Sequence, residues 1–128
     1  MTLKEKAVKL SSEYNRRKMA DSIGYTMCVC CRRVNSWQMF DAGHLVAGRK
    51  LGILFDDRGI WPVCQTCNNN EGSLPQYYAF LDAKFGKKYR ENLVEELRRN
   101  KKKVIKFTST DYENLIIEYK TKLESLNV

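Results

Sequence analysis

The sequence is short of several residue types that mark large protein classes. Only one of its 128 residues is histidine and only two are proline, and no run of 18 apolar residues occurs. Such a run is needed for a membrane-spanning helix, and residues 1–5 lack the apolar stretch of a signal peptide. These absences exclude an integral membrane protein and argue against Sec secretion, so we expect a cytoplasmic setting with reduced cysteines.

Acidic residues are also scarce relative to basic ones. The chain carries 15 Asp and Glu residues against 23 Lys and Arg residues, a formal net charge of +8. The excess gathers in residues 84–106, which hold ten basic and three acidic residues, whereas residues 25–83 hold five of each. One interpretation is a solvated helix face and a flexible joint. We favour a surface that contacts nucleic-acid phosphates, because this charge density exceeds what solubility requires.

Four of the five cysteines form two Cys-x-x-Cys pairs, Cys28/Cys31 and Cys64/Cys67. Two intervening residues let a tight turn direct both sulfurs toward one zinc ion, at Zn–S distances of about 2.3 Å. Two such pairs complete a tetrahedral shell without an open position, which predicts one structural zinc ion per chain. Two disulfides are the alternative, but they are rare in the cytosol and would leave Cys30 over.

Apolar periodicity and turn residues predict a mixed α+β domain. A helix is expected over residues 3–20, with Thr2 and Glu5 as a capping box. Strands are expected over about 38–46 and at 51–55, followed by a turn at 56–59. We divide the single domain, residues 1–128, into an N-terminal helix (1–24), a zinc-bound core (25–72) and C-terminal helices (73–128).

The second half of the chain is expected to be helical. A short helical segment is predicted at 68–72, directly after the second cysteine pair. The next helix has Ser73 and Gln76 as a capping box and ends at Gly86. Another helix is predicted over 87–99, and a last one starts at a Thr110/Glu113 capping box. The apolar faces of the first and last helices either form a dimer interface or bury against the chain's own core.

The single histidine, His44, lies among residues that give it functional weight. On its own a lone histidine is usually a surface or packing residue. Here it ends a predicted strand, three residues after Asp41, and lies between the two cysteine pairs, the second of which runs directly into Asn68. This pattern, Asp-x-x-His followed by Cys-x-x-Cys-Asn, is similar to the skeleton of the HNH, or ββα-metal, nucleases.

The combined motifs resemble those of the NinG/Rap recombination nucleases of lambdoid phages and, more distantly, phage endonuclease VII, a Holliday-junction resolvase. The resemblance extends over about residues 5–126, and the lambdoid proteins carry an additional N-terminal region. The run of residues 67–72 is similar to the Cys-Asn-x-x-Glu-Gly of endonuclease VII. The matching segments are Cys28-x-x-Cys31, Trp37, Asp41-Ala42-Gly43-His44, Leu54-Phe55-Asp56-x-Arg58 and Cys64-x-x-Cys67-Asn68.

The resemblance implies a fold, a function and a set of site residues. The fold is a ββα-metal core with a four-cysteine zinc site, flanked by one N-terminal and several C-terminal helices. The function is that of a metal-dependent endonuclease for branched DNA such as Holliday junctions. His44 is implied as the general base, and Asn68 as a ligand of a catalytic Mg²⁺ or Mn²⁺ ion. Asp41 and Glu71 are implied as further ligands of that ion; the alternatives are a turn or hydrogen-bonding role for Asp41 and a helix-end carboxylate for Glu71.

Basic residues near this core and in the 84–106 segment are the expected DNA contacts. A resolvase nicks two strands, so a homodimer is expected, in the cytoplasm of a bacterial host if the chain is phage-encoded. Two alternatives remain: a zinc-stabilised DNA-binding module without catalysis, and a sequence-specific HNH homing or restriction nuclease. The expected DNA-binding residues are Arg49, Lys50, Lys87, Lys88, Arg98, Arg99, Lys101, Lys102 and Lys103.

Two glycines depart from the pattern of the resembled families. Gly43 stands where endonuclease VII has a carboxylate next to the histidine, and Gly59 stands where the middle HNH asparagine orients that histidine. Either Asp56 or a backbone group takes over the orienting role, or the enzyme is weakened or inactive.

Overall fold

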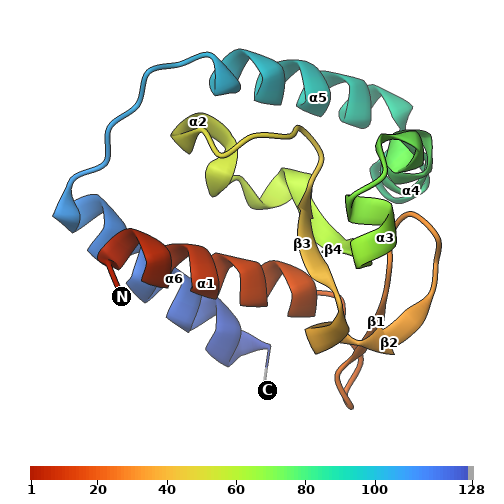
Figure 1. Cartoon of the computed structure of the whole chain (residues 1–128), viewed down its shortest axis with the longest axis horizontal. Helices are drawn as coiled ribbons and strands as arrows, with labels where there is room; N and C mark the ends of the chain where they lie inside the picture. The colour runs from red at the N-terminus through yellow and green to blue at the C-terminus, as the bar shows by residue number, and fades with distance from the viewer. Residues whose placement is uncertain (127–128) are drawn as a thin grey trace.

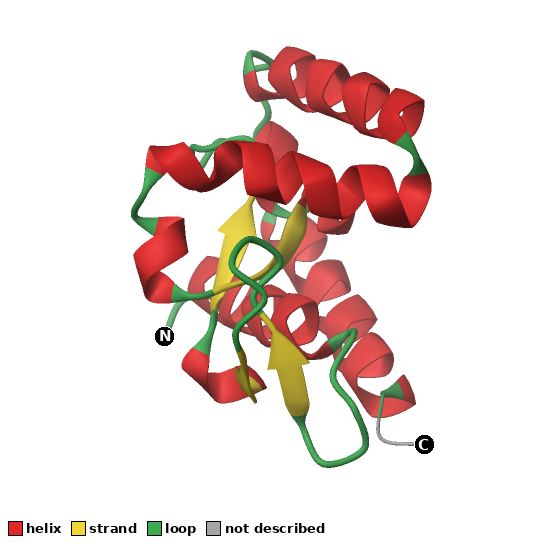
Figure 2. Ribbon diagram, turned by 90° about the vertical axis from the view of Figure 1, so that its right-hand side faces the viewer, coloured by secondary structure: helices red, strands yellow, loops and turns green. Residues whose placement is uncertain are grey.

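The computed structural model describes residues 1–126, which form helices around two small antiparallel sheets, and the α+β prediction is confirmed. Two pairs of helices enclose the strands. One pair is α1 (Leu3–Arg17) and α6 (Ser109–Ser125), which lie side by side. The other pair is α4 (Leu74–Phe85) and α5 (Lys87–Lys101), on the opposite side of the strands (Figures 1 and 2). None of the helices within residues 1–126 is long and apolar enough to cross a membrane.

Helix α1 begins as the sequence predicts, and it ends slightly earlier. The Thr2 hydroxyl accepts a hydrogen bond from the Glu5 backbone N–H at 3.0 Å, and the Glu5 carboxylate accepts one from the Thr2 N–H at 3.3 Å. This reciprocal pair satisfies two of the free N–H groups of the first turn. Helix α1 packs along α6, and its buried residues Ala7, Ser11 and Asn15 lie on one face. The chain's own core therefore uses the inner faces of the first and last helices.

The N-cap of helix α6 lies two residues before the predicted cap, Thr110. Thr108 and Asp111 form its capping box, with hydrogen bonds of 3.2 and 2.7 Å, so the predicted Thr110/Glu113 box is wrong. Both pairs have the correct spacing, but Phe107 packs against Tyr112 with ring centroids 5.4 Å apart. This contact is a hydrophobic staple, which fixes the point where the chain enters the helix.

The central sheet is a pair of strands, β3 (Asp41–His44) and β4 (Ile60–Val63), that run antiparallel with His44 opposite Ile60. Strand β3 is shorter than the predicted 38–46 strand, because Ser36 caps a 3-10 turn, η1 (Trp37–Met39), immediately before it. The predicted strand at 51–55 is wrong: Leu51–Leu54 form a short helix, α2. The true partner strand, β4, follows the 3-10 turn η2 (Asp57–Gly59) and is buried throughout.

A second, smaller sheet carries the first cysteine pair. Strands β1 (Tyr25–Met27) and β2 (Val34–Ser36) are antiparallel, and the turn between them starts at Cys28. The N–H of Val29 donates to the carbonyl of Pro62 in β4 at 3.0 Å. This hydrogen bond ties the turn to the end of β4, where the second cysteine pair begins.

The segment after β4 forms two short turns and then α4. Helix α3 (Gln65–Asn68) is followed by the 3-10 turn η3 (Glu71–Ser73). The single helical segment predicted at 68–72 is therefore two short helical turns, one that starts before residue 68 and one that ends after residue 72. Ser73 does not cap α4 with its side chain, and the predicted Ser73/Gln76 box is wrong. Its hydroxyl instead donates to the carbonyls of Cys67 and Asn70, at 2.7 Å each. Gly86 ends α4 as predicted, and α5 extends two residues beyond the predicted end.

A polar network joins both ends of the chain to the turn η2. The carboxylate of Asp57 accepts hydrogen bonds from Asn15 at 2.9 Å, Tyr119 at 2.7 Å and Lys122 at 2.8 Å. Lys18 donates to the carbonyls of Asp57 and Ile60 at 2.8 and 2.7 Å. Because Asn15 and Tyr119 are almost completely buried, this network holds α1 and α6 against the turn that leads into β4.

Candidate functional site

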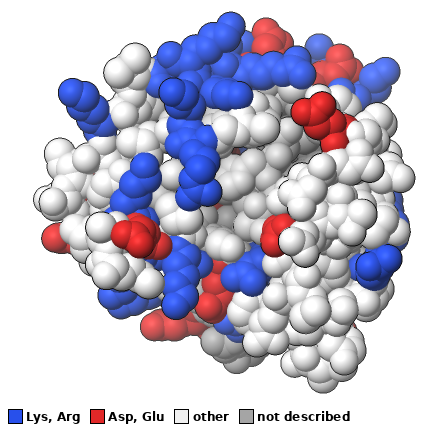
Figure 3. Space-filling view, in the orientation of Figure 1, with Lys and Arg blue, Asp and Glu red and all other residues white. Residues whose placement is uncertain are grey.

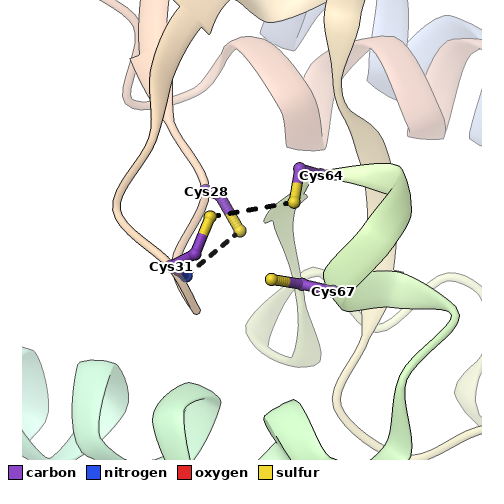
Figure 4. Close-up of side chains that lie close together, drawn as sticks. All are labelled: Cys28, Cys31, Cys64 and Cys67. Atoms are coloured by element: carbon purple, nitrogen blue, oxygen red, sulfur yellow. Dashed lines mark hydrogen bonds between the residues drawn. The ribbon is translucent and has the colours of Figure 1, made fainter.

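The four paired cysteines form one cluster. The sulfur atoms of Cys28, Cys31, Cys64 and Cys67 all lie within 4.8 Å of one another, although the two pairs are separated by 32 residues in sequence. The first pair lies in the β1–β2 turn, and the second lies at the start and near the end of α3. The side chains converge from these two elements toward one point (Figure 4).

The geometry of the cluster fits a tetrahedral zinc site. Four sulfurs at about 2.3 Å from a central ion are separated by about 3.8 Å, and the Cys31 and Cys64 sulfurs are 3.8 Å apart. The N–H of Cys31 lies 3.5 Å from the Cys28 sulfur, so it can donate a hydrogen bond to a ligand thiolate. The prediction that these four residues can hold one structural metal ion such as zinc is supported by this arrangement.

The electrostatics of the cluster also favour a bound cation. Burial raises the pKa of Cys28, but backbone N–H groups of Cys64, Cys31 and Cys30 outweigh it and lower the pKa to about 7. Burial, the neighbouring thiols and the negative charge of Cys28 raise the pKa of Cys67. Several thiolates in so small a volume repel one another, and a divalent cation removes that repulsion.

The fifth cysteine stays outside the cluster. Cys30 is 5% exposed and lines a cavity next to the cluster. Burial, with the nearby Cys28, raises the pKa of Cys30 to about 11. A thiol of this kind remains protonated near neutral pH, which fits its assignment as the spare cysteine.

His44 is the last residue of β3, and one nitrogen of its imidazole contacts a backbone carbonyl. The Nε2 atom lies 3.3 Å from the carbonyl oxygen of Leu54 in α2. A carbonyl can only accept, so this contact favours the tautomer with its proton on Nε2, in which Nδ1 carries the lone pair. Burial, together with the positive charge of Arg49, lowers the pKa of His44 below its ordinary value of 6.5. The imidazole is therefore neutral at pH 7.

Asn68 and Asp41 meet across the space between α3 and β3. The side-chain amide of Asn68 donates to Oδ2 of Asp41 at 3.2 Å. This hydrogen bond leaves the amide oxygen of Asn68 and one carboxylate oxygen of Asp41 available to a ligand. Two oxygen donors on neighbouring elements suit a hard divalent ion, which keeps several of its own waters.

The glycine beside His44 has no room for a side chain. A Cβ atom at Gly43 would collide with Cγ2 of Val63 on the paired strand and would approach the Asn68 amide oxygen to 3.4 Å. A carboxylate therefore cannot occupy this position without a shift of the sheet. Asp41 lies two residues earlier on the same strand face, as alternation along a strand requires.

The second glycine departure is also a packing requirement. A Cβ atom at Gly59 would lie 2.7 Å from Cδ1 of Leu97, a buried residue of α5. The His44 ring, which the asparagine of the resembled families is expected to orient, is here contacted by the Leu54 carbonyl. Asp56 does not take that role, because its carboxylate binds Arg58 at 2.7 Å.

His44 and Asn68 line a cleft of about 670 Å³, which also contains Asp41 and the basic residues Arg16 and Arg49. Both residues also line an adjacent cavity of about 500 Å³, which Glu71 borders. The structure thus brings His44, Asp41 and Asn68 to one cleft and places Glu71 at the neighbouring cavity. Arg16 had no signal in the sequence beyond its charge, because only the packing of α1 beside β3 brings it to the cleft.

A family model matches almost the whole chain. The model described as the bacteriophage lambda NinG protein matches residues 2–128. The chain belongs to the NinG family. No curated protein and no solved structure shows significant similarity to this NinG-family chain.

The expected DNA-binding residues of this NinG-family chain fall into two groups. Arg49 lines the cleft with His44, and a groove of about 820 Å³ beside it is lined by Lys50, Arg98 and residues 101–103. Basic side chains descend from α5 along the edge of a hollow on this face (Figure 3). Lys87 and Lys88 lie at the other end of α5, about 20 Å away along the helix, and Arg99 is paired with Glu95 at 3.1 Å.

Proposed function

We propose that this NinG-family chain is a metal-dependent DNA endonuclease that hydrolyses phosphodiester bonds in branched DNA or recombination intermediates such as Holliday junctions. The observation that carries the proposal is the convergence of His44, Asp41 and Asn68 on one cleft. The antiparallel β3–β4 pair followed by α3, with the cysteine cluster behind it, is the order of elements expected of a ββα-metal nuclease.

His44 acts as the general base. Its Nδ1 lone pair takes a proton from the attacking water, while the Leu54 carbonyl holds the Nε2–H and fixes the ring. No second histidine exists in the chain to replace it. The lowered pKa keeps the base neutral at physiological pH.

Asn68 and Asp41 hold the catalytic divalent ion through their side-chain oxygens. Mg²⁺ or Mn²⁺ bound there supplies stabilisation of negative charge on the phosphate and on the departing oxygen. Asp41 ranks ahead of Glu71 as the second ligand, because Asp41 contacts Asn68 directly and Glu71 lines the neighbouring cavity. Zinc at the four cysteines has a structural role, since four thiolates leave no position for substrate.

DNA binds over the cleft and the lysine-rich groove beside it. Among the described residues, Arg49, Lys50, Arg98 and the 101–103 run border these two hollows. Contacts to phosphates fix position without reading sequence, which suits an enzyme that recognises a branched shape.

Cleavage of defined DNA tests this proposal. Purified protein is offered a four-way junction, a flap and a plain duplex with Mg²⁺. His44→Ala should lose about 10²- to 10⁴-fold in cleavage rate while DNA affinity is retained. Asn68→Ala and Asp41→Ala should lose cleavage with partial recovery at raised Mg²⁺, and Glu124→Ala, an exposed carboxylate of α6, serves as the control.

One observation favours a second candidate, a zinc-stabilised DNA-binding module without catalysis. Gly43 stands where endonuclease VII has a carboxylate beside its histidine, and a side chain at this position would collide with Val63 of the paired strand. This alternative replaces the nuclease if the wild type cuts no DNA in Mg²⁺ or Mn²⁺, or if His44→Ala cuts as fast as the wild type. A sequence-specific HNH nuclease would instead show cleavage of plain duplex at one preferred sequence.

We further propose that the enzyme works as a homodimer in the cytoplasm of the bacterial host, where phage DNA recombines. Two nicks on opposed strands of a junction are most simply made by two copies of one site. The inner faces of α1 and α6 are already used within the chain, so another surface would form the interface. Sedimentation of the protein with and without a four-way junction measures the number of chains bound.

A further inference from the structure

A second cavity adjoins the proposed active site and is used by none of the steps above. Its volume is about 500 Å³, within the range of about 300–1,000 Å³ of small-molecule sites. His44 and Asn68 line both this cavity and the cleft. Whatever occupies the cavity therefore lies next to the reacting phosphate.

The cavity wall is apolar and aromatic. Leu45, Val46, Leu74 and Tyr78 supply it, and Arg90 packs over the Tyr78 ring with its guanidinium carbon 4.5 Å from the ring centroid. Arg90 is itself held by Asp82 at 2.9 Å. The ring is thus fixed in place before any ligand binds, as a stacking surface should be.

Polar side chains that each keep an unused donor, acceptor or charge among the described residues surround this wall. Asn70 uses its amide oxygen to accept from the Gly72 N–H at 2.9 Å, which leaves its NH₂ group available. The Glu71 carboxylate and the Arg98 guanidinium form no ion pair within residues 1–126, whereas Arg90 and Arg99 on the same helix are both paired. The donors and acceptors match the edge of a nucleobase, and the free guanidinium matches a phosphate.

Arg98 also connects the cavity to the lysine-rich groove. It lines both hollows, and the groove continues along Lys50 and residues 101–103. A strand that leaves the cleft through the cavity would therefore run onto a continuous cationic path. This continuity selects single-stranded nucleic acid over an uncharged apolar ligand.

We propose that this cavity holds the base of a nucleotide that has left the duplex, adjacent to the scissile phosphate. The inference rests on the proposed function and specifies its substrate: DNA with an unpaired nucleotide at the cutting site. Extruding a base costs a few kcal/mol in intact duplex and least where the base is already unpaired. Branch points, flaps and bulges are then preferred because they supply that base without this cost.

Equilibrium binding without divalent ions tests the proposal independently of cleavage. Two duplexes are compared: one carries a single unpaired adenine, and the other carries an abasic nucleotide at the same place, which keeps the backbone and removes the base. The wild type should bind the adenine probe about 5-fold or more tightly than the abasic probe. A 2-aminopurine in place of the adenine should change its fluorescence on binding.

Substitutions in the cavity wall complete the test. Tyr78→Ala removes the stacking ring, and Leu74→Trp fills the cavity from its rim, so both should bring the two affinities together. Arg98→Ala should weaken both probes and preserve their ratio, and Tyr25→Ala, an exposed tyrosine of β1, should preserve both affinities. Zinc content checks that each variant is folded.

Two results would overturn the inference. Equal affinity of the wild type for the two probes shows that no base enters the cavity, whether or not the protein cuts DNA. An affinity ratio that persists in both Tyr78→Ala and Leu74→Trp places the base elsewhere. Failure of the nuclease proposal is seen separately, as absent cleavage with the base preference intact.

Discussion

Removing the Asp57 carboxylate should destabilise the whole fold more than its position in a surface turn suggests. Its two oxygens accept from Asn15 and Tyr119, which are 0% and 1% exposed, and from the partly exposed Lys122. These donors come from α1 and α6, so one side chain links three segments. Asp57→Ala deletes all of these bonds and adds no steric conflict.

The size of the destabilisation depends on which hydrogen-bond acceptors each donor keeps after the substitution. A buried donor left without a partner costs about 1–3 kcal/mol, but the Asn15 amide still reaches the Ser11 carbonyl at 2.9 Å and Tyr119 still reaches the Phe55 carbonyl at 3.3 Å. Lys122 can turn to water. The expected loss is about 2–4 kcal/mol, between the cost of one unsatisfied buried donor (about 1–3 kcal/mol) and that of a broken buried ion pair (about 3–5 kcal/mol), out of about 5–15 kcal/mol for a typical domain.

Chemical denaturation in the presence of zinc measures this loss. The matched control is Glu96→Gln, which removes the negative charge from the ion pair between Glu96 and Arg58, side chains that are 41% and 45% exposed. An exposed pair contributes little, so the control should unfold close to the wild type. If Asp57→Ala unfolds no earlier than Glu96→Gln, the network does not hold the helices, and the energetic reasoning is wrong.

Four further predictions concern the metal site, the base, the basic groove and the sheet. Metal analysis should find one zinc per chain; Cys64→Ser should lose it and destabilise the fold, whereas Cys30→Ser should keep it, and a folded zinc-free wild type would contradict the assignment. The cleavage rate should rise with pH through an inflection below 6.5 and then stay level, because burial and Arg49 lower the pKa of the His44 base; Arg49→Ala should move the inflection upward, and an inflection above 6.5 in the wild type would refute this. Replacing Lys101, Lys102 and Lys103 by Ala should weaken DNA binding and flatten its log–log salt dependence by up to about 0.9 per lost phosphate contact, whereas unchanged affinity and slope would show that they are only solvated. Gly43→Asp should lower the melting temperature and fail to raise cleavage, because its Cβ would collide with Val63; faster cleavage would show that the sheet can adapt.

The features that the sequence predicts best are those set by local spacing. The Thr2/Glu5 box depends on residues three apart, and the cysteine cluster depends on two tight turns with two thiols each. The capping box and each of the two cysteine turns depend only on residues close in sequence. The meeting of the two cysteine pairs needs one long-range event, the pairing of Val29 with Pro62, and the metal-ligand chemistry of four thiols predicts that meeting without knowledge of the strands.

The features that the sequence predicts poorly depend on tertiary packing. A short apolar run such as residues 51–55 fits a strand or a buried helix equally well. Its helical form, α2, packs so closely on α5 that a Cβ at Gly52 would collide with the Asn100 carbonyl. The same packing places the Leu54 carbonyl against His44. Neither the helix nor the orienting contact has a signal within the local sequence.

The two glycine departures have separate steric causes in one region of the fold. Gly43 and Gly59 lie on adjoining parts of the β3–β4 hairpin, and the buried hydroxyl of Tyr77 in α4 donates to the carbonyl of Gly43 at 2.7 Å and lies 3.4 Å from that of Gly59. A side chain at Gly43 would meet Val63 within the hairpin itself, whereas a side chain at Gly59 would meet Leu97 and hold α5 away from the hairpin.

Close packing within the hairpin and against α5 therefore excludes side chains at both of these positions of the resembled pattern, and nearby groups stand where they could replace them. The carboxylate moves two residues along the same strand face to Asp41, where it contacts Asn68. Under the proposed function, the orienting acceptor is a main-chain carbonyl, that of Leu54, which needs no particular side chain and so leaves no trace in a sequence motif. On the same proposal, glycine at positions 43 and 59 is compatible with an active enzyme. Asp41 offers the oxygen ligand that Gly43 cannot, and the Leu54 carbonyl orients the His44 base in place of a side chain at Gly59.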